Sequence, residues 1–305
     1  MQLKQALTQG IAHLTANNVP SPRMNAELLL MFTLGSDRAY LYAHPERDLK
    51  SEEMTRYENA LAERSRGMPA QYITGHQEFW GMDFIVTPAV LIPRPETEHV
   101  IETVLELQSS ASGARRPAAG PRTPAVRAFG NQGPGAGSRI LDVGTGSGCI
   151  ALALAKELHD AEIHATDISS AALEIARANA ARHELDGRVH FREADLLAGF
   201  AENSFDFIVS NPPYVGESEA EDVQLEVRKF EPRNAVFAGP TGLEVIARLV
   251  PQAHSALRPG GWLAMEISGT IVEGVKQLLN GWTEIRVIRD LQGIPRVIAA
   301  RKPEI

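Results

Sequence analysis

Apolar positions recur every three or four residues at the start of the chain, which is the spacing of one helix face. Leu3, Leu7, Ile11 and Leu14 form the first such series. The segment Val19-Pro20 ends it, since proline cannot continue a helix. These positions predict an amphipathic helix whose apolar face lies in a core.

Two further helices are expected in the same region. Ser21 and Pro22 form a typical helix start, and Gly35 is a typical stop. A third helix can start at Ser51 and end near Gly67, with Met54, Tyr57 and Leu61 facing inward. Residues 1–70 are therefore predicted to form a small helical bundle.

From residue 139 onward, short apolar strands alternate with helices. Strands are expected at 139–143, 162–166, 188–191, 205–210, 262–267, 284–288 and 296–300, and helices at 149–158, 170–182, 242–257 and 271–279. Strands separated by helices make βαβ units and a mostly parallel sheet. The last two strands have no helix between them, so we expect them to pair antiparallel at one edge. Aromatic and β-branched residues at 77–87, around Gly81, predict a β-hairpin ahead of the sheet.

One stretch interrupts this pattern. Residues 108–137 hold six Gly, four Pro, seven Ala, three Ser and four Arg, but no Asp, Glu or Lys. A chain of this composition buries too little apolar surface to become ordered, so it predicts a disordered insert. The predicted organisation is a helical domain at 1–70, a hairpin linker at 71–93, and an α/β domain at 94–305 that contains the insert.

Charge and composition narrow the function classes. The net charge is -8, and setting aside the insert's four arginines leaves -12, which disfavours a protein that binds nucleic acid through its phosphates. No apolar run approaches the roughly 18 to 20 residues of a membrane span, and the start of the chain lacks a signal-peptide core. The single cysteine, Cys149, excludes an internal disulfide and a thiolate metal site. We therefore expect a cytoplasmic protein without a metal.

A glycine-rich turn carries the first candidate chemistry. Glycines at 144, 146 and 148 follow the first predicted strand of the sheet, where a backbone without Cβ atoms can approach a ligand closely. The dinucleotide fingerprint G-x-G-x-x-G is incomplete, because Cys149 occupies its last position. Asp167 follows Gly148 by nineteen residues and ends the next strand, where a carboxylate can accept hydrogen bonds from ribose hydroxyls. Together these features predict a site for an adenosine-type cofactor. The structural alternative is a tight turn with a helix cap.

A second candidate lies after a later strand, at Asn211-Pro212-Pro213-Tyr214. Two prolines remove two backbone donors, so carbonyls are left unpaired at the sheet edge. The Asn211 side-chain oxygen and the Pro212 carbonyl can accept both N–H bonds of a planar NH2 group, on which Tyr214 can stack. This arrangement suits methyl transfer to an amide or aromatic amine. A strand-ending turn is the alternative.

At these residues the sequence resembles the S-adenosylmethionine-dependent methyltransferases, and more narrowly the HemK/PrmC family of release-factor glutamine methyltransferases. The segments that carry the narrower resemblance are GMPAQYITG at 67–75, FWG at 79–81, LIPRPETE at 91–98, FEP at 230–232 and residues 290–296. NPPY alone is also typical of adenine-N6 methyltransferases, whereas IPRPETE with a helical N-terminal domain resembles the glutamine enzymes. The insert departs from the family pattern, but it precedes the first sheet strand.

The resemblance implies a class I methyltransferase fold, with a Rossmann-like seven-stranded sheet, a helical N-terminal domain and a connecting hairpin. It implies that S-adenosylmethionine is held by Gly144, Thr145, Gly146, Ser147, Gly148, Asp167, Asp195, Leu196 and Asn211, with Asp195 and Leu196 beside the adenine. The acceptor would be bound by Asn211, Pro212, Pro213 and Tyr214, which also form the catalytic set.

The resemblance further implies methyl transfer to the N5 amide of the glutamine in the Gly-Gly-Gln motif of class 1 peptide chain release factors. Residues 1–70 would contact the release factor. We expect a monomer that binds neither nucleic acid nor a membrane.

Four other functions share part of this pattern. An adenine-N6 methyltransferase would need a basic surface, which the charge disfavours. A ribosomal-protein glutamine methyltransferase differs only by family resemblance. A nicotinamide-dependent oxidoreductase leaves NPPY unexplained and is opposed by Cys149. A binding protein with an inactive methyltransferase fold is disfavoured because the motifs are intact.

Overall fold

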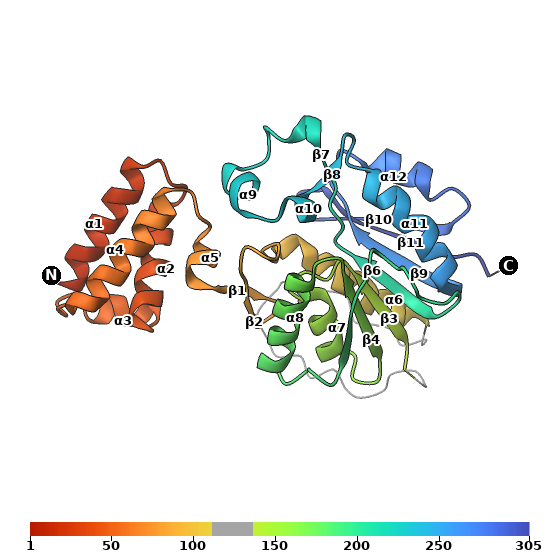
Figure 1. The fold of residues 1–305 in the computed structure, drawn as a ribbon, viewed down its shortest axis with the longest axis horizontal. Helices are drawn as coiled ribbons and strands as arrows, with labels where there is room; N and C mark the ends of the chain where they lie inside the picture. The colour runs from red at the N-terminus through yellow and green to blue at the C-terminus, as the bar shows by residue number, and fades with distance from the viewer. Residues whose placement is uncertain (112–136, 305) are drawn as a thin grey trace.

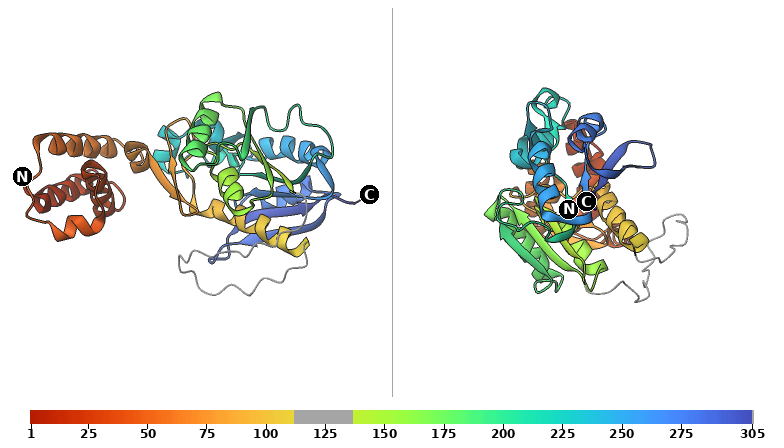
Figure 2. Two further views of the ribbon diagram at one scale, coloured as in Figure 1. Left: turned by 90° about the horizontal axis from the view of Figure 1, so that it is seen from below. Right: turned by 90° about the vertical axis from the view of Figure 1, so that its right-hand side faces the viewer.

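The computed structural model describes residues 1–111 and 137–304. Figure 1 shows a helical unit at the N-terminus, joined through a hairpin to a larger α/β part, and the two chain ends lie at opposite ends of the molecule (Figures 1 and 2). Within the described ranges, no helix is both long and apolar enough to cross a membrane.

The helical unit contains the three predicted helices and two short ones that the sequence did not reveal. Its elements are α1 (Leu3–Ala16), α2 (Pro22–Leu34), α3 (Arg38–Ala43), α4 (Ser51–Ser65) and α5 (Ala70–Thr74). Leu14, Leu29 and Leu30 are fully buried in its core. The buried Tyr57 donates a hydrogen bond to the Ala26 carbonyl at 3.1 Å, which ties α4 to α2.

The hairpin is formed by β1 (His76–Phe79) and β2 (Met82–Ile85), as predicted. Gly81 sits in its turn at a φ of 66°, a conformation that glycine adopts without steric cost. Phe79 and Phe84 join the same apolar core as the sheet. The hairpin is also fastened by Asn179 of α8, whose amide bonds both the N–H and the carbonyl of Ile85.

A seven-stranded sheet forms the centre of the α/β part, with the strand order β10-β11-β9-β6-β3-β4-β5. Its strands are β3 (Arg139–Val143), β4 (Glu162–Asp167), β5 (Val189–Glu193), β6 (Phe205–Ser210), β9 (Leu257–Glu266), β10 (Thr283–Arg289) and β11 (Pro295–Arg301). The first five are mutually parallel, and β11 pairs antiparallel with both β9 and β10. The predicted parallel sheet with an antiparallel edge is confirmed.

Helices cover both faces of this sheet (Figure 1). The helices α6 (Glu98–Ala111), α7 (Cys149–Glu157) and α8 (Ser170–Arg182) pack on one face, and α11 (Glu244–Ala256) and α12 (Val272–Leu278) on the other. Successive residues of a strand point to opposite faces of the sheet, so Ile140 packs toward α7 and Leu141 toward α11. The result is the three-layer architecture that the alternating pattern predicts.

The prediction of a disordered insert at 108–137 is wrong for its beginning. Its first four residues belong to α6, which continues to Ala111 because Leu107 still packs into the core. Gln108 also donates a hydrogen bond from Nε2 to Ser138 Oγ, at 3.2 Å. Of the other residues in this stretch, 112–136 lie outside the described residues, and Gly137 lies within them.

Several short elements near the sheet were not predicted. They are η1 (Pro95–Thr97), β7 (Val215–Gly216), η2 (Glu217–Glu219), α9 (Leu225–Phe230), α10 (Arg233–Val236) and β8 (Phe237–Gly239). In Figure 1, α9 lies between the helical unit and the rest of the molecule. Arg64 of α4 pairs there with Glu226 of α9, at 2.8 Å between Nη2 and Oε1.

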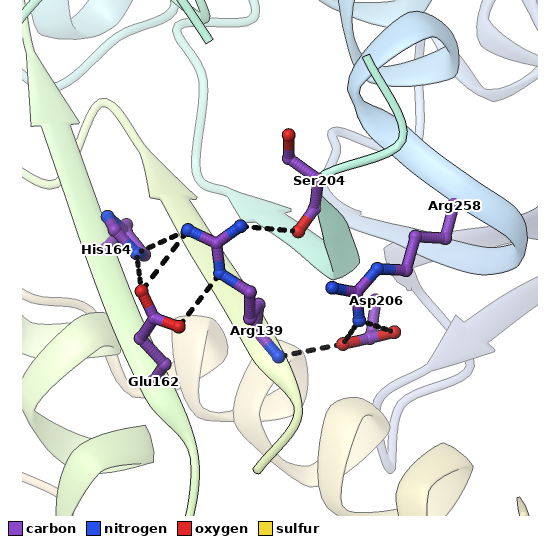
Figure 3. Close-up of polar contacts among 6 residues, drawn as sticks. All are labelled: Arg139, Glu162, His164, Ser204, Asp206 and Arg258. Atoms are coloured by element: carbon purple, nitrogen blue, oxygen red, sulfur yellow. Dashed lines mark hydrogen bonds and ion pairs between the residues drawn. The ribbon is translucent and has the colours of Figure 1, made fainter. Parts of the chain in front are cut away.

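A polar network lies at the amino-terminal ends of the parallel strands (Figure 3). The Arg139 guanidinium contacts Glu162 and His164, and its backbone N–H donates to Asp206. Asp206 also accepts two hydrogen bonds from Arg258. This network therefore joins four adjacent strands, β4, β3, β6 and β9, at the ends away from the glycine-rich turn.

Candidate active site

A pocket of about 320 Å³ opens at the carboxyl ends of β3, β4 and β6. This is the edge at which doubly wound sheets bind ligands. Its lining includes nine of the twelve predicted site residues: Gly144, Thr145, Gly146, Ser147, Asp167, Asp195, Leu196, Asn211 and Pro213. The structure thus brings both predicted motifs to one cavity. Gly148, Pro212 and Tyr214 are not among its lining residues.

The glycine turn has an open surface toward this pocket. Gly144 and Gly146 have φ values of 72° and 55°, and a Cβ added to either would meet no atom within 4 Å. Gly148 differs, because a Cβ there would lie 3.2 Å from Ala176 of α8. The first two glycines therefore leave room for a ligand, and the third allows the helices to pack closely. A cradle of this kind fits the adenosine and methionine parts of S-adenosylmethionine.

Asp167 stands at the rim of the cradle, at the end of β4. Its Oδ2 accepts the Gly146 N–H at 2.9 Å, and its Oδ1 accepts the Ser169 N–H at 2.9 Å. Burial raises the pKa of this carboxyl, while the backbone donors act against the rise. Each oxygen keeps a lone pair, so the side chain can still accept hydrogen bonds from a ribose.

Asp195 and Leu196 line the next wall of the pocket. Asp195 forms an ion pair with Arg248 of α11, which also lines the pocket. Leu196 adopts a φ of 54°, and its carbonyl accepts a hydrogen bond from Thr166 Oγ1 at 3.1 Å. Arg248 could not be predicted as a pocket residue from local sequence, since its partner Asp195 is 53 residues away.

Asn211 is held by a chain of three side chains. Its Nδ2 donates to Thr97 Oγ1 at 3.1 Å, and Thr97 Oγ1 donates to Glu266 Oε2 at 2.6 Å. Tyr214 donates to the other oxygen of Glu266 at 3.0 Å. No described residue donates a hydrogen bond to Asn211 Oδ1. The protein therefore accepts one of the two N–H donors of the Asn211 amide, and the amide oxygen is available.

Glu266 ends β9 and is almost completely buried, with 3% of its surface exposed. Burial raises the pKa of this carboxyl, and the hydroxyl donors Thr97 and Tyr214 oppose the rise. Thr97 belongs to the IPRPETE segment, but neither it nor Glu266 was predicted as a site residue. A lone carboxylate at the end of an apolar strand was the available signal.

A second buried carboxylate shapes the pocket wall. Glu231 of the FEP segment pairs with Arg94 and accepts the Ile92 N–H at 3.2 Å. These contacts hold the IPRP segment next to the start of α10. They explain why the LIPRPETE and FEP segments, which are far apart in the sequence, lie together in the structure. Within the described ranges, no group of three His, Cys, Asp or Glu side chains is arranged to hold a metal ion.

Comparisons with known proteins agree with these observations. The chain matches the model of the "PrmC N-terminal domain" at residues 5–75 and that of the "Methyltransferase small domain" at residues 126–229. A protein of Koribacter versatilis (strain Ellin345), named release factor glutamine methyltransferase, is 53% identical over 304 residues, 99% of each chain. A protein of Moorella thermoacetica with the same name is 39% identical and is matched over the full length of both chains.

The chain belongs to the release factor glutamine methyltransferase family. The resemblance based on the glycine turn, NPPY and IPRPETE is thereby confirmed, and so is the class of S-adenosylmethionine-dependent enzyme. Family membership also implies S-adenosylmethionine as the cofactor.

Similarity of fold extends beyond the release factor glutamine methyltransferase family. The solved structure of the hMettl16 catalytic domain with MAT2A 3′UTR hairpin 6 superposes with a TM-score of 0.53 at 16% identity. It covers 84% of this chain and 83% of that chain. At this identity the match supports only the fold, which is the predicted class I methyltransferase fold.

Proposed function

We propose that this chain transfers the methyl group of S-adenosylmethionine to the side-chain amide nitrogen of the glutamine in the Gly-Gly-Gln motif of class 1 peptide chain release factors. The observation that carries the proposal is the Asn211 side chain, whose oxygen is left available next to a pocket that fits the cofactor. Relatives of the same full length carry the corresponding name.

The cofactor would be held by the glycine turn from Gly144 to Gly148 and by Asp167, with Asp195 and Leu196 beside its adenine. Asn211 would contact both cofactor and acceptor. Arg248, which pairs with Asp195, would keep that wall of the pocket in place.

The acceptor amide would be bound by Asn211, Pro212, Pro213 and Tyr214. The Asn211 oxygen and the Pro212 carbonyl each accept one N–H of the glutamine, which orients the nitrogen lone pair toward the methyl group. Tyr214 is fixed by Glu266, and its ring borders the acceptor.

When bound, S-adenosylmethionine supplies a methyl group on an already activated sulfonium. The chain therefore needs to align the acceptor more than to activate it, and no metal is required. With S-adenosylmethionine bound, the amide nitrogen would bond to the methyl carbon as the carbon–sulfur bond breaks, and positive charge would develop on that nitrogen. The two oxygen acceptors stabilise that charge, and the excess proton leaves to water.

We further propose that residues 1–70 contact the release factor, because this helical unit projects from the α/β part beside α9 (Figure 1). We expect the enzyme to act as a monomer in the cytoplasm, where translation terminates. Its net charge of -8 does not favour direct nucleic-acid binding.

Mass spectrometry of a purified release factor, incubated with this protein and S-adenosylmethionine, tests the proposal. We expect one methyl group on the glutamine of the Gly-Gly-Gln motif and none on a factor in which that glutamine is replaced by Asn or Ala. Asn211→Ala should lower the single-turnover rate far more than the affinity for the cofactor. Methylation of a ribosomal protein or of DNA in place of the release factor would overturn the substrate assignment.

A further inference from the structure

The acceptor side of the pocket depends on a buried carboxylate that does not line the cavity. Glu266 receives one hydroxyl hydrogen bond at each oxygen, from Thr97 at 2.6 Å and from Tyr214 at 3.0 Å. Thr97 is 1% exposed and Glu266 is 3% exposed. Because both residues are buried, water cannot readily replace these hydrogen bonds. The donors and acceptors of the protein itself therefore set the direction of each bond.

The direction of each hydrogen bond follows from counting protons. A threonine hydroxyl has one proton to donate, and each oxygen of Glu266 accepts one hydroxyl hydrogen bond. Thr97 therefore donates its proton to Glu266, and the lone pairs of its oxygen remain for Asn211. Only the NH2 end of Asn211 can use them, so the amide oxygen must point the other way.

We infer that Glu266 is a positioning residue that acts through Thr97 to hold Asn211 with its amide oxygen facing the acceptor glutamine. This inference rests on the proposed function and deepens it. An asparagine amide can rotate by 180° and exchange its two ends with little change in shape. If the NH2 end faced the acceptor, two donors would oppose each other and the glutamine nitrogen would not be held.

The same chain of contacts also shows how the orientation can be lost. A Gln side chain at position 266 can donate to Thr97 through its NH2 group. The Thr97 proton would then be free to bond the Asn211 oxygen, and the reversed amide would become favourable. Without the Thr97 hydroxyl, neither orientation of Asn211 is selected.

The test compares single-turnover methyl transfer to a release factor at saturating cofactor and substrate. We expect Thr97→Val to lower this rate about tenfold to a hundredfold, the scale on which misaligned reacting groups lose rate. Thr97→Ser keeps the hydroxyl and should recover most of the lost rate. Cofactor dissociation constants should change by less than about threefold, because the hydrogen bonds involved lie on the acceptor side.

A matched control is available in α6. Thr103 is also buried, at 5% exposure, but its hydroxyl donates to the His99 carbonyl of its own helix. Thr103→Val makes the same chemical change without touching Asn211, so its transfer rate should remain that of the wild type. A rate loss shared equally by both valine variants would indicate a general packing effect and would overturn the inference.

Combining variants separates positioning from stability. In an Asn211→Ala background, Thr97→Val should lower the rate by less than about twofold, because a residue that acts through Asn211 has nothing left to orient. In the otherwise wild-type chain, Glu266→Gln should lower the rate about tenfold or more. Full additivity, or a wild-type rate in Thr97→Val or Glu266→Gln, would overturn this inference while leaving the proposed function intact. Absence of transfer by the wild type would overturn both.

Discussion

We propose two tasks for the Asp167 carboxylate. It accepts backbone hydrogen bonds from Gly146 and Ser169, which hold the glycine turn against the end of β4. It also lines the pocket, so its remaining lone pairs can accept hydrogen bonds from a ligand there. Asp167 therefore shapes the site, and we propose that it also contacts the cofactor.

Replacing Asp167 separates these two contributions. Asp167→Ala should weaken S-adenosylmethionine binding by about 1.5 to 3 kcal/mol, the range for hydrogen bonds to a charged acceptor. Asp167→Asn keeps one acceptor oxygen and should lose less. Isothermal titration calorimetry measures both affinities, with thermal melting as the check on folding. An unchanged affinity in a folded Asp167→Ala protein would remove this side chain from the cofactor site.

Asp142 is a second carboxylate at the glycine turn, and it has no access to solvent. Its Oδ2 accepts hydrogen bonds from Thr145 Oγ1 and from the Ala151 N–H, whereas its Oδ1 has no hydrogen-bond partner in the described residues. Burial raises the pKa of Asp142 to about 7, and the nearby Asp167 adds to the rise. Ionising this group in the folded protein is therefore costly.

The raised pKa of Asp142 makes stability depend on pH. Between its ordinary pKa of 3.8 and the folded value of about 7, the folded protein holds a proton that the unfolded chain releases. The contribution of Asp142 to the free energy of unfolding must therefore fall as pH rises through this range, and it levels off above it.

Asp142→Asn removes that dependence. We expect the stability of the variant relative to the wild type to be greater at about pH 8 than at about pH 5, by about 1 to 3 kcal/mol. Urea unfolding at the two pH values measures the difference. Parallel pH dependence in both proteins would contradict a raised pKa at this position.

At the scale of elements, the parallel strands carry polar groups at both of their ends, and the two ends have different roles. The carboxyl ends of the strands form the pocket, and the other edge carries the network of Figure 3. There the Arg139 guanidinium also lies over the Phe205 ring, 5.2 Å from its centre. Its hydrogen bond to the Ser204 carbonyl, at 3.1 Å, fixes the chain that enters β6.

This arrangement predicts that Arg139 contributes to stability and not to cofactor binding. Arg139→Met keeps much of the apolar stem but loses the charged hydrogen bonds, so the free energy of unfolding should fall by about 1 to 2 kcal/mol. Denaturant unfolding measures this change. The affinity for S-adenosylmethionine should stay within about twofold of the wild type, because the network lies at the far edge of the sheet. A large loss of affinity would show that the two edges are coupled.

Local patterns were sufficient to predict the helices and strands that bury continuous apolar surface. The prediction succeeded for α7 and β3 because their side chains are buried almost throughout. It also placed Asn211 and Asp167 correctly at strand ends, since their position follows from the order of strands in a parallel sheet.

The elements that the sequence did not reveal are short and are held by distant partners. The η1 turn is fixed by Thr97 on Glu266, a contact across 169 residues, and α9 is held by Arg64 across 162 residues. Neither element has enough apolar positions to produce a periodic signal. For the same reason the hydrogen bonds that join Asn211, Thr97 and Glu266 could not be predicted from the sequence, because these residues are far apart along the chain.

At the scale of the whole molecule, α9 connects the helical unit to the acceptor side of the site. Arg64 is 4% exposed and bonds Asn25, the Met68 carbonyl and Glu226, so one side chain holds both units together. Lys229 adds a hydrogen bond to the Arg66 carbonyl. A partner bound to the helical unit beside α9 would thus lie near a segment that follows the NPPY loop along the chain, after β7 and η2.

Described residues on the two sides of positions 112–136 lie close together in the folded protein. Gln108 near the end of α6 and Ser138 just before β3 are joined by a hydrogen bond of 3.2 Å. Both lie at the edge of the sheet where β3 begins, whereas the pocket lies where β3 ends. A short connection can therefore bridge these ends without disturbing the site.

We expect these 25 residues to be dispensable for methyl transfer. Replacing them with a Gly-Ser linker of about six residues shortens the loop roughly fourfold, which should stabilise the protein by about 1 kcal/mol because closure entropy varies slowly with length. Thermal melting and single-turnover transfer to a release factor measure the two effects. A Gly-Ser linker of the original length serves as the control for loop length. If both linkers lowered the transfer rate to the same extent, the segment's own residues would have to contact the substrate.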